Sequence, residues 1–121
     1  MKWWVRAFNF KITDHKVREN GDLFYWCESE NGIPIYISGP RKDQFLPKGD
    51  SGVKQGIEHF GVDVEDLDDE LERLKKLGAT LLEGPVGGSD GVKACWIGCP
   101  DDVRVELIQL AKKLNGQKKI G

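Results

Sequence analysis

The sequence predicts an α+β fold within a single domain of 121 residues. Three observations support this prediction. The first forty residues alternate between strand-like and turn-like segments, residues 67–77 have the apolar spacing of one helix, and short alternating strands follow up to residue 110. A chain of this length can bury roughly two thirds of its unfolded surface, which is enough to form a core.

The first half is predicted to contain strands and turns only. Residues 5–13 alternate in polarity, and residues 23–27 and 33–38 form a hairpin around a turn at residues 29–32. Residues 41–55, rich in Gly, Pro, Lys and Asp, are predicted to be a linker. In the first strand, one face carries Phe8, Phe10 and Ile12 and the other carries Ala7, Asn9 and Lys11.

One helix is predicted over residues 67–77. Its leucines recur at the spacing of a single apolar stripe, Asp66 is suited to cap the first turn, and Gly78 follows where a left-handed residue commonly ends a helix. The leucines of this stripe are Leu67, Leu71, Leu74 and Leu77.

Strands are predicted on both sides of this helix, at residues 56–64, 80–83, 92–97 and 103–110. Alternation assigns Phe60, Val62 and Val64 to the helix-facing side of the first strand, which leaves His59 on the opposite side. In the last strand the same reasoning turns Glu106 away from the helix. We therefore expect His59 and Glu106 to share a face and to lie close enough to bind a common ligand.

Composition and charge exclude several classes of function. A net charge of −2 without a basic stripe argues against nucleic-acid binding, and no apolar run is long enough to span a bilayer. The three cysteines lack the spacing of a zinc or redox motif, so reduced, buried thiols are expected. Without a recognisable signal peptide, a cytoplasmic location is expected. The basic segment 111–121 is predicted to be a flexible tail.

The two halves resemble each other as an internal repeat. Residues 8–14 can be aligned with residues 60–66, Trp26 with Trp96, and residues 33–36 with residues 103–106. The spacing grows between the first and the later matches, so the first half is predicted to lack a helix. The predicted organisation is a reduced first module at residues 1–40, the linker at 41–55, a βαβββ module at 56–110 and the tail at 111–121.

Two segments, GIEHFGVDVEDLDDELERLKKLGATLLEGP and ACWIGCPDDVRVELIQL, resemble the second βαβββ module of the vicinal-oxygen-chelate superfamily, which includes glyoxalases, bleomycin-resistance proteins and extradiol dioxygenases. The resemblance covers residues 56–110. It implies a cleft between β-modules that binds a small organic molecule, in many members with a divalent metal. The fold class it implies is a βαβββ module joined to a β-rich first module that lacks its helix.

The resemblance also implies site residues. His59 and Glu106 match family metal ligands, suited to nickel, zinc, manganese or iron, and Glu106 is also the candidate catalytic residue. Ala7 and Tyr36 stand at the two ligand positions of the first module, where neither supplies the expected ligand. The candidate binding residues for an organic ligand are Tyr36, Trp96, Asn9 and Lys11.

Three classes of function remain open from the sequence. With metal bound, the resemblance implies lyase, isomerase or dioxygenase chemistry. Without metal, it implies a binding or antibiotic-resistance protein in which Tyr36, Trp96 and His59 contact the ligand. The third class is a degenerate module used for subunit contact. A homodimer is expected, because a missing helix would expose apolar strand surface at Phe8, Phe10 and Ile12.

Overall fold

The computed structural model of the protein describes residues 1–87 and 89–110. The chain divides into two compact units, Met1–Lys48 and Gly49–Gly121, which are described separately below. The predicted basic tail, residues 111–121, lies outside the described residues. None of the helices in the described part has the length and apolar character that crossing a membrane requires.

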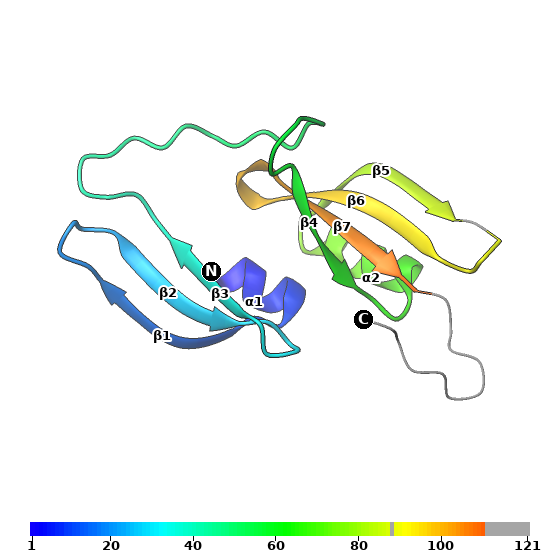
Figure 1. The fold of residues 1–121 in the computed structure, drawn as a ribbon, viewed down its shortest axis with the longest axis horizontal. Helices are drawn as coiled ribbons and strands as arrows, with labels where there is room; N and C mark the ends of the chain where they lie inside the picture. The colour runs from blue at the N-terminus through cyan, green and yellow to red at the C-terminus, as the bar shows by residue number, and fades with distance from the viewer. Residues whose placement is uncertain (88, 111–121) are drawn as a thin grey trace. The chain divides into compact units, whose positions relative to one another are not determined.

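The second unit is one βαβββ module, as the sequence predicts (Figure 1). Its four-stranded sheet has the order β4-β7-β6-β5, in which β4 runs parallel to β7 and the other neighbours are antiparallel. The elements are β4 His59–Asp63, α2 Leu67–Lys76, β5 Thr80–Gly87, β6 Lys93–Cys99, the 3₁₀ turn η1 Pro100–Asp102 and β7 Val103–Gln109.

Helix α2 begins where its local chemistry predicts. The Asp66 side chain accepts a hydrogen bond from the backbone N–H of Asp69 at 3.0 Å. A second contact could not be read from the sequence: Gln109 Oε1, at the end of β7, accepts from the backbone N–H of Leu67 at 2.8 Å. The first turn of the helix is therefore tied to the last strand of its own sheet. At the other end, Gly78 has the positive φ expected of a C-terminal glycine.

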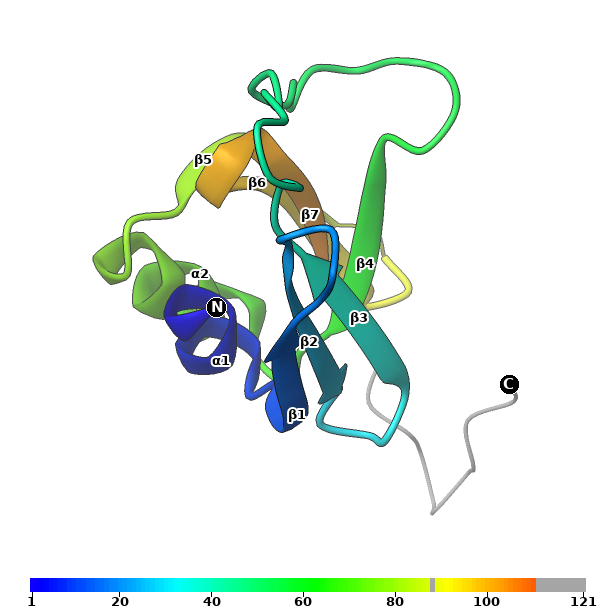
Figure 2. The same cartoon turned by 90° about the vertical axis from the view of Figure 1, so that its left-hand side faces the viewer.

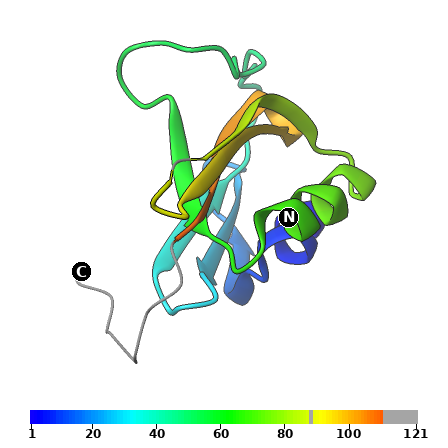
Figure 3. The same ribbon diagram turned by 90° about the vertical axis from the view of Figure 1, so that its right-hand side faces the viewer.

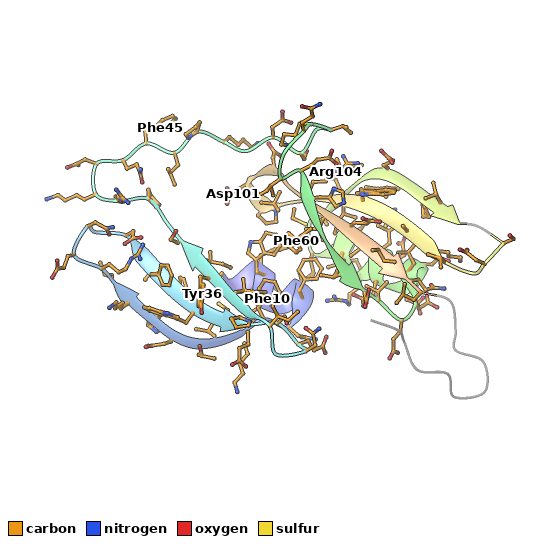
Figure 4. All side chains as sticks on the ribbon, viewed as in Figure 1. Phe10, Tyr36, Phe45, Phe60, Asp101 and Arg104 are labelled. Atoms are coloured by element: carbon orange, nitrogen blue, oxygen red, sulfur yellow. The ribbon has the colours of Figure 1, made fainter. Side chains whose placement is uncertain are left out.

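The core of the second unit lies between α2 and one face of the sheet (Figure 3). The helix packs against β5, β6 and β7. Phe60 on β4 was expected to pack under the helix, but 42% of it is exposed (Figure 4). β4 is an edge strand of the sheet, and the helix packs mainly against β5, β6 and β7. The side chains with no exposure in this core are Leu67, Leu74, Cys95, Ile97, Val105 and Leu107.

The first unit consists of a short helix and a three-stranded antiparallel sheet (Figure 2). The sheet has the order β1-β2-β3. The elements are α1 Lys2–Phe8, β1 Lys11–Val17, β2 Leu23–Glu28 and β3 Pro34–Ser38. The α+β class with two sheets is therefore confirmed, whereas the predicted absence of a helix from the first half is wrong.

The strand predicted at residues 5–13 is correct only for residues 11–13, which begin β1, whereas residues 5–8 belong to α1. Residues Trp4 and Phe8, one helical turn apart, bring their rings to 5.8 Å, and Phe10 stacks on Trp4 at 6.2 Å. Asn9 ends the helix with φ 55°, a conformation that asparagine tolerates better than most residues. In so short an apolar segment, alternation and helical spacing overlap, so aromatic packing decided the conformation.

The helix α1 changes which elements of the two halves correspond in the repeat. The first unit follows the order αβββ and the second βαβββ, so within the described residues β4 is the element without a counterpart. The later matches hold: Trp26 pairs with Tyr36 across β2 and β3, just as Trp96 pairs with Glu106 across β6 and β7. Tyr36 is thus the structural counterpart of Glu106. Ala7 is a buried residue of α1 and occupies no ligand position.

Residues 39–58, which include the predicted linker, contain no helix or strand in the described chain. Phe45 in this segment is 86% exposed and Ile57 is 96% exposed (Figure 4). Whether the two units act as a single domain joined by this linker stays a prediction.

Candidate functional site

The second unit brings the two predicted metal ligands together. In the parallel pair of β4 and β7, His59 lies beside Arg104, and Gly61 lies beside Glu106. Val105 and Leu107, which flank Glu106 in the sequence, are buried under α2. Glu106 therefore projects from the opposite face of the sheet, as strand alternation predicts. His59 Nε2 lies 3.0 Å from Glu106 Oε1. The two side chains are 29% and 20% exposed, so solvent can still reach the pair.

A second carboxylate holds the other side of the imidazole. Glu58 Oε1 lies 3.1 Å from His59 Nδ1, and Glu58 Oε2 accepts a hydrogen bond from the backbone N–H of Lys54 at 3.1 Å. The hydrogen bond from Lys54, followed by that of His59, lowers the pKa of Glu58. Glu58 is therefore an ionised group that orients the ring.

The arrangement of His59 between two carboxylates has a chemical consequence. A neutral imidazole carries a single N–H, so it can donate to only one of Glu58 and Glu106. His59 Nε2 and Glu106 Oε1 are thus a nitrogen and an oxygen atom held 3.0 Å apart.

Arg104 lies next to this pair on the same face and is only 6% exposed (Figure 4). Its guanidinium donates to the backbone carbonyl of Ser51 at 3.1 Å and to Glu83 Oε1 at 3.3 Å. Arg104 Nε is 3.4 Å from Glu58 Oε1 but makes no hydrogen bond to any residue that the structure describes. Through Ser51 and Glu83, Arg104 thus connects the loop before β4 with strand β5, and its Nε lies close to the Glu58 carboxylate.

Trp96 completes this face. It pairs directly with Glu106 across β6 and β7, and its ring stands perpendicular to the His59 ring at 6.4 Å between centroids. The Arg104 guanidinium lies 6.0 Å from the centre of the Trp96 ring. Trp96, predicted as a binding residue, therefore lies beside the predicted metal ligands.

Tyr36, also predicted as a binding residue, lies on the first unit within an aromatic cluster. It is 61% exposed and stacks with Phe24 at 6.1 Å, and Phe24 contacts Trp26 at 4.6 Å. The Lys16 ammonium lies 5.6 Å from the Trp26 ring and the Arg18 guanidinium 4.2 Å from the Phe24 ring. Trp26 and Tyr36 thus stand in the first unit at the positions that Trp96 and Glu106 take in the second.

The other predicted binding residues have different surroundings from those expected. Asn9 is the residue that ends α1, and its side chain donates to Glu30 at 3.3 Å. Lys11 opens β1, opposite Glu28, and is exposed. Asn9 does not lie on a strand, because residues 2–8 form α1 and Asn9 ends it, whereas Lys11 lies on a strand as predicted.

The cysteines do not contribute a reactive site. Burial raises the pKa of Cys99 to about 12, and it also raises those of Cys27 and Cys95. Within the two described ranges, no group of three or more His, Cys, Asp and Glu residues is arranged to hold a metal ion. The predicted ligands His59 and Glu106 are therefore a pair without a third such residue among the described ones.

Sequence reasoning missed Glu58, Glu83 and Arg104. A signal was present for two of them. Glu58 directly precedes His59, and Arg104 is two residues before Glu106 on the same strand, so alternation alone places it on the same face. Glu83 is brought to Arg104 by the pairing of β5 with β6, which the sequence does not specify.

Comparison with known proteins agrees with this fold. Residues 1–96 match the family described as the glyoxalase/bleomycin resistance protein/dioxygenase superfamily. The chain belongs to this superfamily. No curated protein sequence matches the chain.

Three solved structures illustrate the likeness in fold. A glyoxalase family protein from Bacillus cereus has 17% identity and a TM-score of 0.69, with 85% of this chain and 82% of that chain covered. The fosfomycin resistance protein FosX from Listeria monocytogenes, in complex with Mn(II) and sulfate, has 17% identity and a TM-score of 0.61, with 89% of this chain and 78% of that chain covered. A variant of glyoxalase I from Zea mays has 21% identity and a TM-score of 0.67, with 92% of this chain and 40% of that chain covered.

Proposed function

We propose that the protein binds a small, oxygen-bearing organic molecule at the face formed by His59, Trp96 and Glu106, together with a divalent metal ion. The observation that supports this proposal is the 3.0 Å contact of His59 Nε2 with Glu106 Oε1, made while Glu58 occupies Nδ1. His59 Nε2 and Glu106 Oε1 are a nitrogen and an oxygen of the kinds that divalent metals bind.

The donor set fits a divalent metal in kind. Imidazole and carboxylate suit nickel, zinc, manganese and iron, and the FosX relative contains Mn(II). Two protein donors are fewer than the three or more that catalytic metal sites usually have, so we expect modest affinity. The metal would supply Lewis acidity toward substrate oxygens, which is the basis for lyase, isomerase or dioxygenase chemistry.

The residues of the chain have separate roles in this proposal. Glu58 holds His59 Nδ1, which leaves Nε2 to face the cation, and such carboxylate partners are usual behind metal-binding histidines. Glu106 is the second ligand and the candidate catalytic base. Trp96 forms an apolar wall beside the pair and excludes water from that side.

The proposal is tested by titrating the chelator-treated protein with Mn²⁺ and recording free Mn²⁺ by electron paramagnetic resonance. The wild type should bind one equivalent, and His59→Ala and Glu106→Gln should each weaken binding by roughly tenfold or more. Glu72→Gln, on the surface of α2, is the matched control and should bind as the wild type does. If the wild type binds no Mn²⁺, Ni²⁺ or Zn²⁺, the metal-dependent function is wrong.

A metal-free binding protein is the second candidate. The aromatic cluster of Phe24, Trp26 and Tyr36 favours it, because flat organic ligands stack on such rings. In this case an organic ligand should raise the melting temperature of the protein in the presence of chelator. Asn9 and Lys11, at the start of the same unit, stay proposed ligand contacts.

A homodimer stays a prediction. Phe10 is 5% exposed and packs with α1, but Ile12 is 39% exposed, so only part of the apolar surface expected to be open is covered. The role of a degenerate module in subunit contact likewise stays a prediction.

A further inference from the structure

The segment that leads into β4, residues 49–58, contains no helix or strand but is attached to the second unit along its length (Figure 1). We call this segment the strap. Apolar packing does not hold it in place, because Val53 is 77% exposed and Ile57 is 96% exposed. Its position is therefore set by hydrogen bonds and by close backbone contacts.

The strap begins in close contact with η1, where Asp101 lies (Figure 4). A Cβ placed on Gly49 would lie 2.6 Å from the carbonyl oxygen of Asp101, which is closer than real side chains come to a backbone atom. The φ of Gly49 is not positive, so glycine is required here only by this close approach. A side chain at residue 49 would therefore push the strap away from η1.

Arg104 holds the strap two residues further on. Its guanidinium donates to the backbone carbonyl of Ser51 at 3.1 Å and to Glu83 on β5 at 3.3 Å. Arg104 is 6% exposed, so it cannot follow the strap into solvent without leaving its place beside the Trp96 ring. The strap is therefore fixed to a side chain that the sheet itself holds.

Glu58 connects the far end of the strap to His59. Its Oε2 accepts a hydrogen bond from the backbone N–H of Lys54 at 3.1 Å, and its Oε1 lies 3.1 Å from His59 Nδ1. The Lys54 ammonium donates to the carbonyl of Gly52 at 3.2 Å, which closes the turn within the strap. Because one carboxylate contacts both the backbone of the strap and the imidazole, a shift of the strap changes the support of the ring.

We infer that the strap is a positioning element for His59: while Gly49 and Arg104 hold it, Glu58 faces Nδ1 and the ring presents Nε2 to Glu106. The role of the strap rests on the proposed metal-dependent function and adds a means of regulating the same site. A metal ion that binds the aligned ring must also favour the attached strap, because two coupled equilibria affect each other by the same factor. Release of the strap therefore weakens metal binding, and metal binding tightens the strap.

The test measures both directions of this coupling in the full chain, with Zn²⁺ as the probe. Competition with a metal-sensitive dye gives the Zn²⁺ affinity, and hydrogen exchange of the Lys54 N–H, followed by NMR, reports the attachment of the strap. Gly49→Ala loosens the strap through its clash with Asp101. Gly39→Ala is the matched control, because Gly39 also lacks a positive φ and its nearest Cβ contact is 3.9 Å from Leu23 O.

Gly49→Ala should exchange the Lys54 N–H faster than the wild type and should bind Zn²⁺ roughly threefold or more weakly. Gly39→Ala should match the wild type in both measurements. Arg104→Met, which removes the donor to the strap from the side of the sheet, should show the same two losses as Gly49→Ala. It keeps the test decisive if the alanine variant does not fold.

The wild type tests the reverse direction. Zn²⁺ should slow exchange of the Lys54 N–H, because it stabilises the arrangement in which Glu58 holds both Lys54 and His59. It should not slow exchange of the Gly32 N–H, which bonds to the carbonyl of Ser29 in a turn of the first unit.

Two kinds of result overturn the inference and are distinguishable. If Gly49→Ala exchanges the Lys54 N–H faster but binds Zn²⁺ as the wild type does, or if it exchanges at the wild-type rate, the strap does not position His59, and the metal-dependent function stands. If the wild type binds no Zn²⁺, Mn²⁺ or Ni²⁺, the proposed function fails, and the role of the strap fails with it.

Discussion

Replacing Arg104 with methionine would remove one buried positive charge while keeping most of the side-chain volume. Arg104 is 6% exposed and donates to the carbonyl of Ser51 at 3.1 Å. A hydrogen bond from a charged donor contributes about 1.5–3 kcal/mol, and its loss also leaves the Ser51 carbonyl without its donor. The ion pair with Glu83, which is 53% exposed, adds only about 0.2–1 kcal/mol because solvent screens it.

We therefore expect Arg104→Met to lower the free energy of unfolding by about 2–4 kcal/mol. Urea denaturation is the assay, followed by tryptophan fluorescence, since Arg104 lies over the Trp96 ring. The matched control is Arg73→Met on the surface of α2, where the arginine pairs with Glu70 at 2.8 Å. This control should lose less than about 1 kcal/mol.

A stability of Arg104→Met equal to that of Arg73→Met would refute the reasoning. Methionine would then pack as well as the aliphatic part of the arginine, and the polar contacts of Arg104 would make no net contribution to the free energy of unfolding. Replacement of buried ion pairs by apolar residues has that outcome when both charged partners are removed, but here the carboxylates of Glu58 and Glu83 remain.

Two further predictions concern stability. Leu74→Ala should lower the free energy of unfolding by roughly 2–5 kcal/mol, because Leu74 has no exposure and its loss opens a cavity under α2. Leu81→Ala, where the leucine is 37% exposed, should cost clearly less in the same urea titration, and equal losses would contradict the packing described for α2. The hydrogen bond from Arg18 lowers the pKa of Asp22 in the folded protein below its ordinary value of 3.8. The ionised carboxylate therefore stabilises the fold fully above pH 3.8, and this stabilisation is lost as the pH falls through the lowered pKa of the folded state. The gap in urea midpoint between the wild type and Asp22→Asn should therefore be present near pH 7 and shrink in acid, and a gap independent of pH would contradict this.

The sequence was most informative where chemistry is local. The helix over Leu67–Lys76 follows from leucine spacing and from Asp66, which caps the first turn as predicted. Strand alternation was enough to place His59 and Glu106 on one face, because a period of two admits no other arrangement once the apolar residues face a helix. The roles of these residues stay proposals.

The sequence was misleading where a short segment satisfied two periodicities. Residues around Phe8 and Phe10 alternate like a strand, yet residues 2–8 form a helix in which Trp4 contacts Phe8 one turn away. The placement of Ala7 and Asn9 on a strand was wrong for this reason, whereas Lys11 lies in β1. No local rule weighs an aromatic contact against alternation over so few residues.

The sequence alone determined the βαβββ order of the second unit, the cap of α2 and the shared face of His59 and Glu106, since each depends on residues close together in the chain or on a fixed period. Only the tertiary structure decided that Glu58 and Glu106 hold the two nitrogens of His59, that Arg104 is buried among Ser51, Glu83 and Trp96, and that Gly61 lies beside Glu106. These contacts depend on the register between strands distant in sequence, and register is set by the packing of the whole sheet.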